Sequence, residues 1–216
     1  MPESPSTAQY RALLQQLDRW MEEGRRRHPG VVPCRAGCTA CCHGPFDVTV
    51  ADVELIRTAV LELPAAERAA VLDRARRLLE TMRALEPSWI PPYDVADLGE
   101  DRFDALTAAL AAEPCPLLGD DGRCRIYQSR PLVCRLIGLP MGSRGGRVIE
   151  NACPIQDRFP AYASLAPQPF ALEEFESAED ACLRAAAGRV LGDPERWAYE
   201  TTIAAVLATL DAAEAR

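Results

Sequence analysis

Residues 34–42 read CRAGCTACC and place four cysteines within nine positions, at Cys34, Cys38, Cys41 and Cys42. Disulfides, a metal site, an iron–sulfur cluster and a catalytic thiol all use cysteine, so the stretch by itself leaves four kinds of chemistry open. A disulfide between the adjacent Cys41 and Cys42 would be strained. Because so many thiols in one short segment need partners from elsewhere, we expect the chain to fold around this stretch.

Five more cysteines follow, and four of them lie in loop, hairpin or turn contexts: Cys115, Cys124, Cys134 and Cys153. Several of these contexts contain glycine or proline, which let the backbone approach a ligand closely and leave amides free to bond sulfur. Cys182 instead lies in an alanine-rich helical stretch, where a buried small apolar residue is the expected role. The other eight cysteines are therefore predicted to be metal ligands.

The composition indicates one folded, water-soluble domain spanning residues 1–216, with 48% hydrophobic and 26% charged residues. The sequence has no run of 18 apolar residues and no leader pattern at its start, which predicts a cytoplasmic protein without a membrane segment. The cytoplasm is kept reducing. Cysteines there favour metal ligation or reactive thiols over disulfides.

The sequence contains no lysine, which excludes P-loop and Schiff-base chemistry. A net charge of −8 and a pI near 4.9 make a general nucleic-acid-binding surface unlikely. Only two histidines occur, and no nucleophile–base pair is recognisable, so catalysis ranks behind binding and whether the protein is an enzyme stays open.

Hydrophobic periodicity predicts a mainly α fold. Thr49 is the expected N-cap of one helix, with Asp52 in its first turn. The sequences GDDG at 119–122 and RGG at 144–146 predict two small β-hairpins. Together these patterns predict an irregular cysteine-rich cage of loops and hairpins over about 34–154, braced by helices. The predicted helices cover 6–27, 50–62, 64–86, 102–112 and the tail from 170 to 212.

The identity of the metal is harder to read. The spacing CxxxCxxC of Cys34, Cys38 and Cys41 is similar to that of radical S-adenosylmethionine enzymes, but the chain lacks their series of alternating strands and helices. A zinc ribbon would show two CxxC knuckles, and only Cys38–Cys41 qualifies. The Cys–Pro pairs at Cys115 and Cys153 are similar to the closing cysteine of bacterial ferredoxins, which modestly favours an iron–sulfur cluster.

The boxes CRAGCTACC, CPLLGDDGRCRIYQSRPLVCR and ACP resemble the YkgJ-like bacterial cysteine-cluster family, described as a zinc- or iron-chelating domain. The resemblance runs from about Cys34 to Pro154 and has all eight cysteines in place, whereas helices at both ends lie outside it. Members of this family are often labelled iron–sulfur oxidoreductases on the motif alone. The resemblance thus implies metal binding, and catalysis only weakly.

Neighbouring residues of an extended stretch point to opposite sides, so Cys41 and Cys42 are not expected to face one metal. Either two centres exist or some thiols are spare. Four thiolates on zinc or on a 4Fe–4S core leave about −2 charges to be offset. His43 could ligate, but a hydrogen bond to sulfur is the favoured role. Arginines beside the cysteines could supply positive charge, and the candidate cofactor-binding residues are Arg35, Arg125 and Arg135.

Our first hypothesis is a protein that holds one or two iron–sulfur clusters, of the 4Fe–4S type, with an electron-transfer role and a redox or protein partner. The alternative is a zinc-binding structural or interaction module without redox activity. Ligands of cysteine alone suit both metals, because soft thiolates select zinc as well as iron–sulfur clusters.

Overall fold

The computed structural model describes residues 4–35 and 37–210. The described part is mainly helical, with small sheets, as the periodicity predicted. No described helix is both long enough and apolar enough to cross a membrane. The α-helices are α1 (Pro5–Arg27), α2 (Val50–Leu61), α3 (Ala65–Leu85), α4 (Glu100–Ala109), α5 (Leu132–Leu136), α6 (Pro160–Ala163), α7 (Leu172–Val190) and α8 (Ile203–Ala208). The strands are β1 (Asp47–Thr49), β2 (Met141–Gly142), β3 (Val148–Ile149), β4 (Gln168–Pro169) and β5 (Glu200–Thr202).

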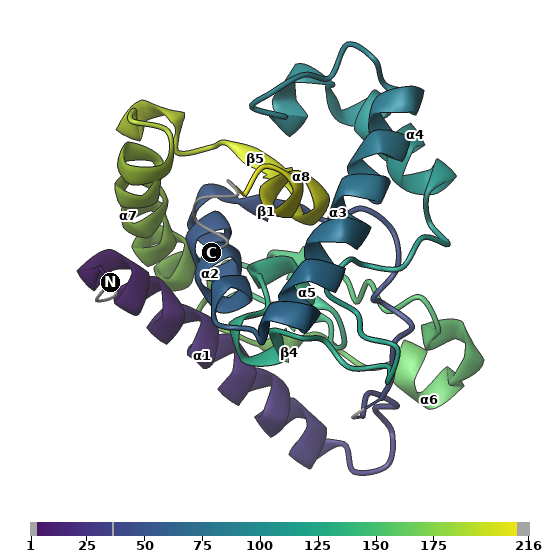
Figure 1. The fold of residues 1–216 in the computed structure, drawn as a ribbon. Helices are drawn as coiled ribbons and strands as arrows, with labels where there is room; N and C mark the ends of the chain where they lie inside the picture. The colour runs from purple at the N-terminus through teal and green to yellow at the C-terminus, as the bar shows by residue number, and fades with distance from the viewer. Residues whose placement is uncertain (1–3, 36, 211–216) are drawn as a thin grey trace.

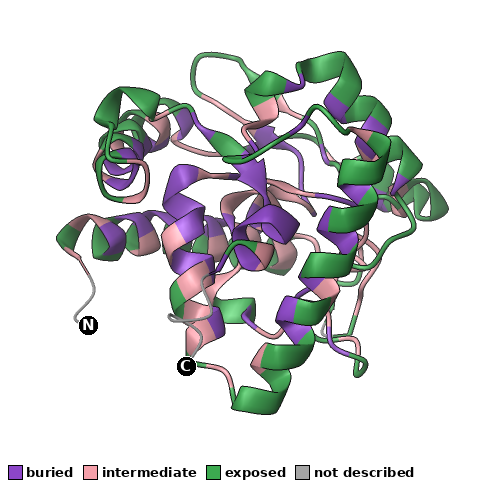
Figure 2. Ribbon diagram, turned by 45° about the horizontal axis from the view of Figure 1, so that its top comes forward, coloured by how far each residue is buried: buried purple, intermediate pink, exposed green. Residues whose placement is uncertain are grey.

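Helix α2 lies at the centre of the molecule, with α1 and α7 along one side and α8 on the other (Figure 1). It begins as the sequence predicted. Thr49 caps the helix and forms a capping box with Asp52, which satisfies two backbone amides of the first turn. Figure 2 shows α2 and α8 as largely buried ribbons between helices that expose one face. The hydrophobic effect therefore fixes α2 as the scaffold on which the surrounding segments pack.

Helix α1 packs closely against the loop that follows α5. A Cβ atom on Gly24 would lie 2.3 Å from Cδ1 of Leu139, so only glycine allows this approach. The apolar face predicted for 6–27 is buried, with Tyr10, Leu14 and Leu17 almost inaccessible to solvent. Helix α1 thus supports both the central helix and the loop after α5.

Two small sheets tie distant segments together. Strands β2 and β3 form the antiparallel hairpin predicted around Gly145 and Gly146, and β4 adds to β2 in parallel. The turn at 119–122 is a tight loop closed by an isolated antiparallel bridge between Leu118 and Cys124. Both predicted hairpins are present, although the first is reduced to this single bridge.

The tail differs from the prediction of helix from 170 to 212. Residues 172–190 (α7) and 203–208 (α8) of the tail are helical. Residues 200–202 instead form β5, which pairs antiparallel with β1 and aligns Val48 with Thr201. The β-branched Thr201 and Thr202 are buried there, and pairing with β1 outweighs the local helical pattern. Residues 211 and 212 of the predicted helix lie outside the described residues.

Candidate metal centre

The eight candidate ligands come from four separate segments. Residues 34–42 connect α1 to β1, the tight loop carries Cys115 and Cys124, α5 carries Cys134, and Cys153 follows β3. Cys115 and Cys153 are buried and the other six are half-buried. All nine cysteines are free thiols. Cys182 is buried in α7 within the main hydrophobic core, in keeping with the role predicted for it.

In the segment 34–42, turns occur at residue 37 and at residues 40–41. The amide of Cys38 donates to the carbonyl of Arg35 at 2.9 Å, and the amide of Cys42 donates to that of Thr39 at 2.8 Å. Because the chain turns here, the premise of an extended stretch does not hold for Cys41 and Cys42. Their side chains interact, and this hydrogen bond, followed by burial, raises the pKa of the Cys41 thiol. Adjacent thiols therefore meet at one place.

A first thiol group surrounds Cys34. Burial, and then the neighbouring Cys153, Cys38 and Cys41, together raise the pKa of the Cys34 thiol to about 11. A Cβ atom on Gly138 would lie 3.6 Å from Sγ of Cys34, and φ is +133° at that glycine. The loop after α5 therefore lies next to this sulfur, and its backbone conformation at residue 138 is one that glycine adopts without strain.

A second thiol group surrounds Cys134. Burial raises the pKa of this thiol, and Cys115, Cys124 and Cys41 raise it further. Burial also raises the pKa of Cys115 to about 12, with Cys124 as a contributing neighbour. Cys41 affects the central thiol of both groups, so the two groups meet at the Cys41–Cys42 pair. The backbone supports this arrangement, because the amide of Cys115 donates to the carbonyl of Cys42 at 2.9 Å.

These thiols are neighbours without being in ligation geometry. Within residues 4–35 and 37–210, no three histidine, cysteine, aspartate or glutamate side chains converge closely enough to hold a metal ion as they stand. Ligation would require the thiols to draw together and lose their protons, and their raised pKa values add to the cost of deprotonation. The donor set nevertheless fits zinc or an iron–sulfur cluster, since it is made of soft sulfur ligands on short turns.

The candidate arginines have different surroundings. Burial raises the pKa of Cys124, and the charges of Arg130 and Arg125 offset part of that rise; Arg130 also offsets a small part of the rise at Cys41. Arg125 pairs at the same time with Asp121 and Glu67. Arg35 is exposed. Arg130 was not among the three candidate cofactor-binding arginines. It nevertheless lies close to two of the thiols, Cys41 and Cys124, which come from different segments.

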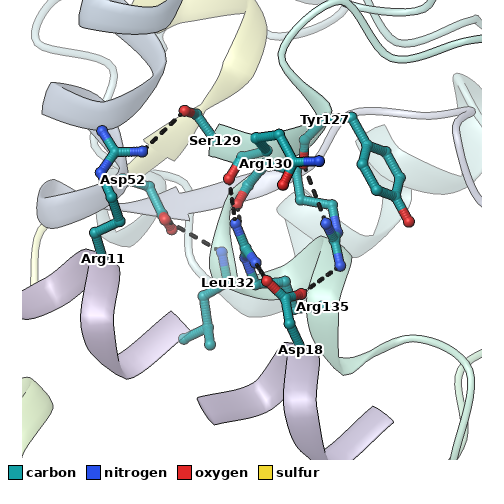
Figure 3. Close-up of polar contacts among 9 residues, drawn as sticks. Arg11, Asp18, Asp52, Tyr127, Ser129, Arg130, Leu132 and Arg135 are labelled. Atoms are coloured by element: carbon teal, nitrogen blue, oxygen red, sulfur yellow. Dashed lines mark hydrogen bonds and ion pairs between the residues drawn. The ribbon is translucent and has the colours of Figure 1, made fainter. Parts of the chain in front are cut away.

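Arg135 is buried and serves as a connection between segments. Its guanidinium group pairs with Asp18 of α1 and donates to the carbonyls of Arg130 and Gln128, at 3.0 and 2.9 Å. Figure 3 shows that Arg130 reaches the same carboxylate, at 2.6 Å. These contacts fix the turn that precedes Cys134 against α1. The sequence analysis singled out Arg135 but did not predict Asp18 as its partner, because the only signal for Asp18 was one acidic residue next to the apolar face of a helix.

His43 lies next to the second thiol group. Its Nδ1 atom is 3.0 Å from the carbonyl oxygen of Thr39, and its backbone forms an isolated bridge with Pro114. This backbone bridge aligns the turn at 39–43 with the segment that leads to Cys115. The ring therefore stabilises the turn that carries Cys41 and Cys42.

Residues 33–183 match the model of the family described as "CxxCxxCC: Putative zinc- or iron-chelating domain". The matched region contains all eight candidate ligands as well as α2, α3 and most of α7. No curated protein and no solved structure matches the chain.

Proposed function

Because the chain belongs to the CxxCxxCC family of zinc- or iron-chelating domains, we propose that it binds iron–sulfur clusters for electron transfer. The observation that carries this proposal is that eight thiols from four segments are neighbours, six of them grouped around the Cys41–Cys42 pair. The proposed ligands are Cys34, Cys38, Cys41, Cys42, Cys115, Cys124, Cys134 and Cys153.

We assign the eight thiols to two centres. The first would take Cys34, Cys38 and Cys153, and the second would take Cys115, Cys124 and Cys134. Each group then has three thiols and lacks one, and the Cys41–Cys42 pair lies where the groups meet. One thiol from the pair would complete each set of four, the number that both zinc and a 4Fe–4S cluster require.

The charge around the second group supports an anionic centre. Four thiolates around a 4Fe–4S core carry about −2 charges in total. Burial raises the pKa of Cys124, but Arg130 and Arg125 lie close enough to offset part of this cost of forming the thiolate. Their positive charges would offset part of that excess and make the reduced centre easier to form.

An iron–sulfur cluster bound here would supply a one-electron couple, and the second group has a route to the surface. Cys124 lines an open pocket of about 380 Å³ together with Arg125 and the exposed Tyr127. A redox partner that docks at this pocket would approach the ligand closely. This access favours electron transfer over a purely structural role.

Anaerobic purification tests the proposal. We expect a brown protein with sulfur-to-iron charge-transfer absorption, and with iron and acid-labile sulfide in amounts that match two clusters. A colourless protein with stoichiometric zinc under the same conditions would establish the alternative, a zinc-stabilised interaction module. We retain that alternative because a donor set made only of cysteines suits structural zinc as well as it suits an iron–sulfur cluster.

A further inference from the structure

Asn151 occupies a buried position between two segments of the first thiol group. Only 7% of its surface is exposed. Its Oδ1 atom accepts hydrogen bonds from the amides of Gly138 and Cys153, both at 3.1 Å. One side-chain oxygen therefore holds the loop next to Cys34 and the loop that carries Cys153.

The other half of the same amide group makes no hydrogen bond of ordinary geometry with any described residue, although the Asn151 side chain lies close enough to the Tyr162 hydroxyl to lower its pKa. The Nδ2 atom of Asn151 is buried and has no hydrogen-bond partner among the described residues. A buried donor left without a well-formed hydrogen bond destabilises the protein. Such a group is available to a stronger acceptor than the phenol oxygen of Tyr162.

The side-chain amide of Asn151 has the buried phenol of Tyr162 as a neighbour, and that phenol lies near Cys34 and Cys153. Tyr162 is only 1% exposed and donates its hydroxyl hydrogen to the carbonyl of Gly138 at 2.6 Å. Burial raises the pKa of Tyr162, the Asn151 side chain lowers it, and Cys153 and Cys34 raise it again. The unpaired amide thus lies in one small neighbourhood with both sulfurs.

We propose that the side-chain amide of Asn151 donates an N–H···S hydrogen bond to a metal-bound thiolate of Cys34 or Cys153. This inference rests on the proposed function and names a residue that neither the cysteine motif nor the charge pattern indicated. A neutral thiol is a poor acceptor, whereas a metal-bound thiolate carries negative charge and accepts such bonds well. The amide oxygen positions the two loops, and the amide nitrogen stabilises the charge that ligation creates.

Asn151→Asp tests the donor with little change in shape. The new carboxylate keeps an oxygen for both backbone amides and replaces the N–H donor by a second oxygen. We expect the metal affinity of the first centre to fall about 10–100-fold in competition with a chelator. The matched control is Gln168→Glu, since Gln168 is also 7% exposed and its amide donates to the carbonyl of Ala166, away from the cysteines. Equal losses of metal in both variants would overturn the inference.

The wild-type protein provides a second test that needs no substitution. Thiolate sites accept cadmium in place of zinc or iron. In protein loaded with ¹¹³Cd, we expect a scalar coupling between the metal and a side-chain amide proton of Asn151, which also separates a lost donor from an added charge. Couplings to cysteine β-protons without one to Asn151 would contradict the inference and leave the proposed function intact. A wild-type protein that binds no metal would instead contradict the proposed function.

Discussion

Oδ1 of Asp52 in α2 accepts a hydrogen bond from the backbone amide of Leu132, the first residue of α5, at 3.1 Å. The same oxygen accepts a bond from the hydroxyl of Tyr10 at 3.1 Å, and the carboxylate completes the capping box with Thr49. One buried side chain therefore joins α1, the start of the central helix, and the short helix that carries Cys134. The scaffold and the second thiol group are linked at this residue.

Asp52→Ala should destabilise the fold and weaken the second centre. The substitution removes a helix cap and leaves the buried amide of Leu132 unpaired, so we expect the free energy of unfolding to fall by about 3 kcal/mol. Urea denaturation measures this loss, and metal analysis of the folded protein measures the second effect. Glu80→Ala, at an exposed position of α3, is the control and should change neither quantity. Wild-type stability in Asp52→Ala would show that the link is unimportant.

Arg135 has two candidate roles: it supports the turn that precedes Cys134, or it compensates the negative charge of a bound cluster. All contacts described above are to Asp18 and to two backbone carbonyls, so we expect Arg135→Met to lower the free energy of unfolding by about 2 kcal/mol. Arg135→Lys should recover only part of it, because an ammonium group cannot match the planar fork of arginine. The exposed Arg123→Met is the control. Loss of metal at unchanged stability would instead support the cofactor-binding role predicted from the sequence.

The eight cysteines should sort into two sets when each is replaced by serine. Cys38→Ser and Cys124→Ser belong to different groups, so we expect each to remove about half of the bound metal and the double variant to remove nearly all of it. Serine is a harder and much less acidic ligand than cysteine. Metal and sulfide analysis measures these losses. Cys182→Ser is the control, and a metal loss as large as that of the ligand variants would refute the division of the cysteines.

Removal of the metal should loosen the cysteine cage more than the helical scaffold. Among the described residues the thiols are not close enough together to hold a metal ion. Metal binding would therefore draw the loops of residues 34–154 together and stabilise their tertiary packing. We expect limited proteolysis of verified metal-free protein to cut within this region first, while circular dichroism retains most of the helical signal of α1, α2, α3 and α7. An identical cleavage pattern with and without metal would disagree with this expectation.

The buried Glu179 should make stability depend on pH. Burial, and then the charges of Asp52, Glu176, Asp180 and Glu200, together raise its pKa to about 7. Its unfolded pKa is near 4.3, so the stabilising effect of the protonated form is complete below that pH and is lost as pH rises to about 7. We expect the free energy of unfolding to decline by about 1.4 kcal/mol per pH unit across this interval from this group alone.

Glu179→Gln should abolish that part of the pH dependence, because the amide cannot ionise. The comparison is made by urea denaturation at pH 5 and pH 7, with the same metal content in both proteins. Buried Gln168→Glu should change the profile without removing the contribution of Glu179. Parallel profiles for wild type and Glu179→Gln would show that Glu179 titrates normally.

Local patterns were sufficient for much of the fold. The spacing of apolar residues predicted α1, α2 and α3 to within a few residues, and Thr49 with Asp52 predicted the start of α2, because helix periodicity and capping depend on near neighbours. The tail was predicted less well. Residues 200–202 form a strand because β1, about 150 positions earlier, offers an edge to pair with.

The sequence by itself indicated the kind of site, since cysteines grouped in short motifs favour soft metal ligation whatever the arrangement in space, even though one of the eight, Cys134, lies in a helix. Only the tertiary structure decided which thiols are neighbours, because Cys153 reaches Cys34 and Cys134 reaches Cys115 through contacts between distant segments. The same holds for Asn151, whose side chain is unremarkable in the sequence. Its two amide atoms acquire different environments when the loop after α5 and the loop that carries Cys153 pack together, because Oδ1 is paired with two backbone amides and Nδ2 has no hydrogen bond of ordinary geometry within the described part of the chain.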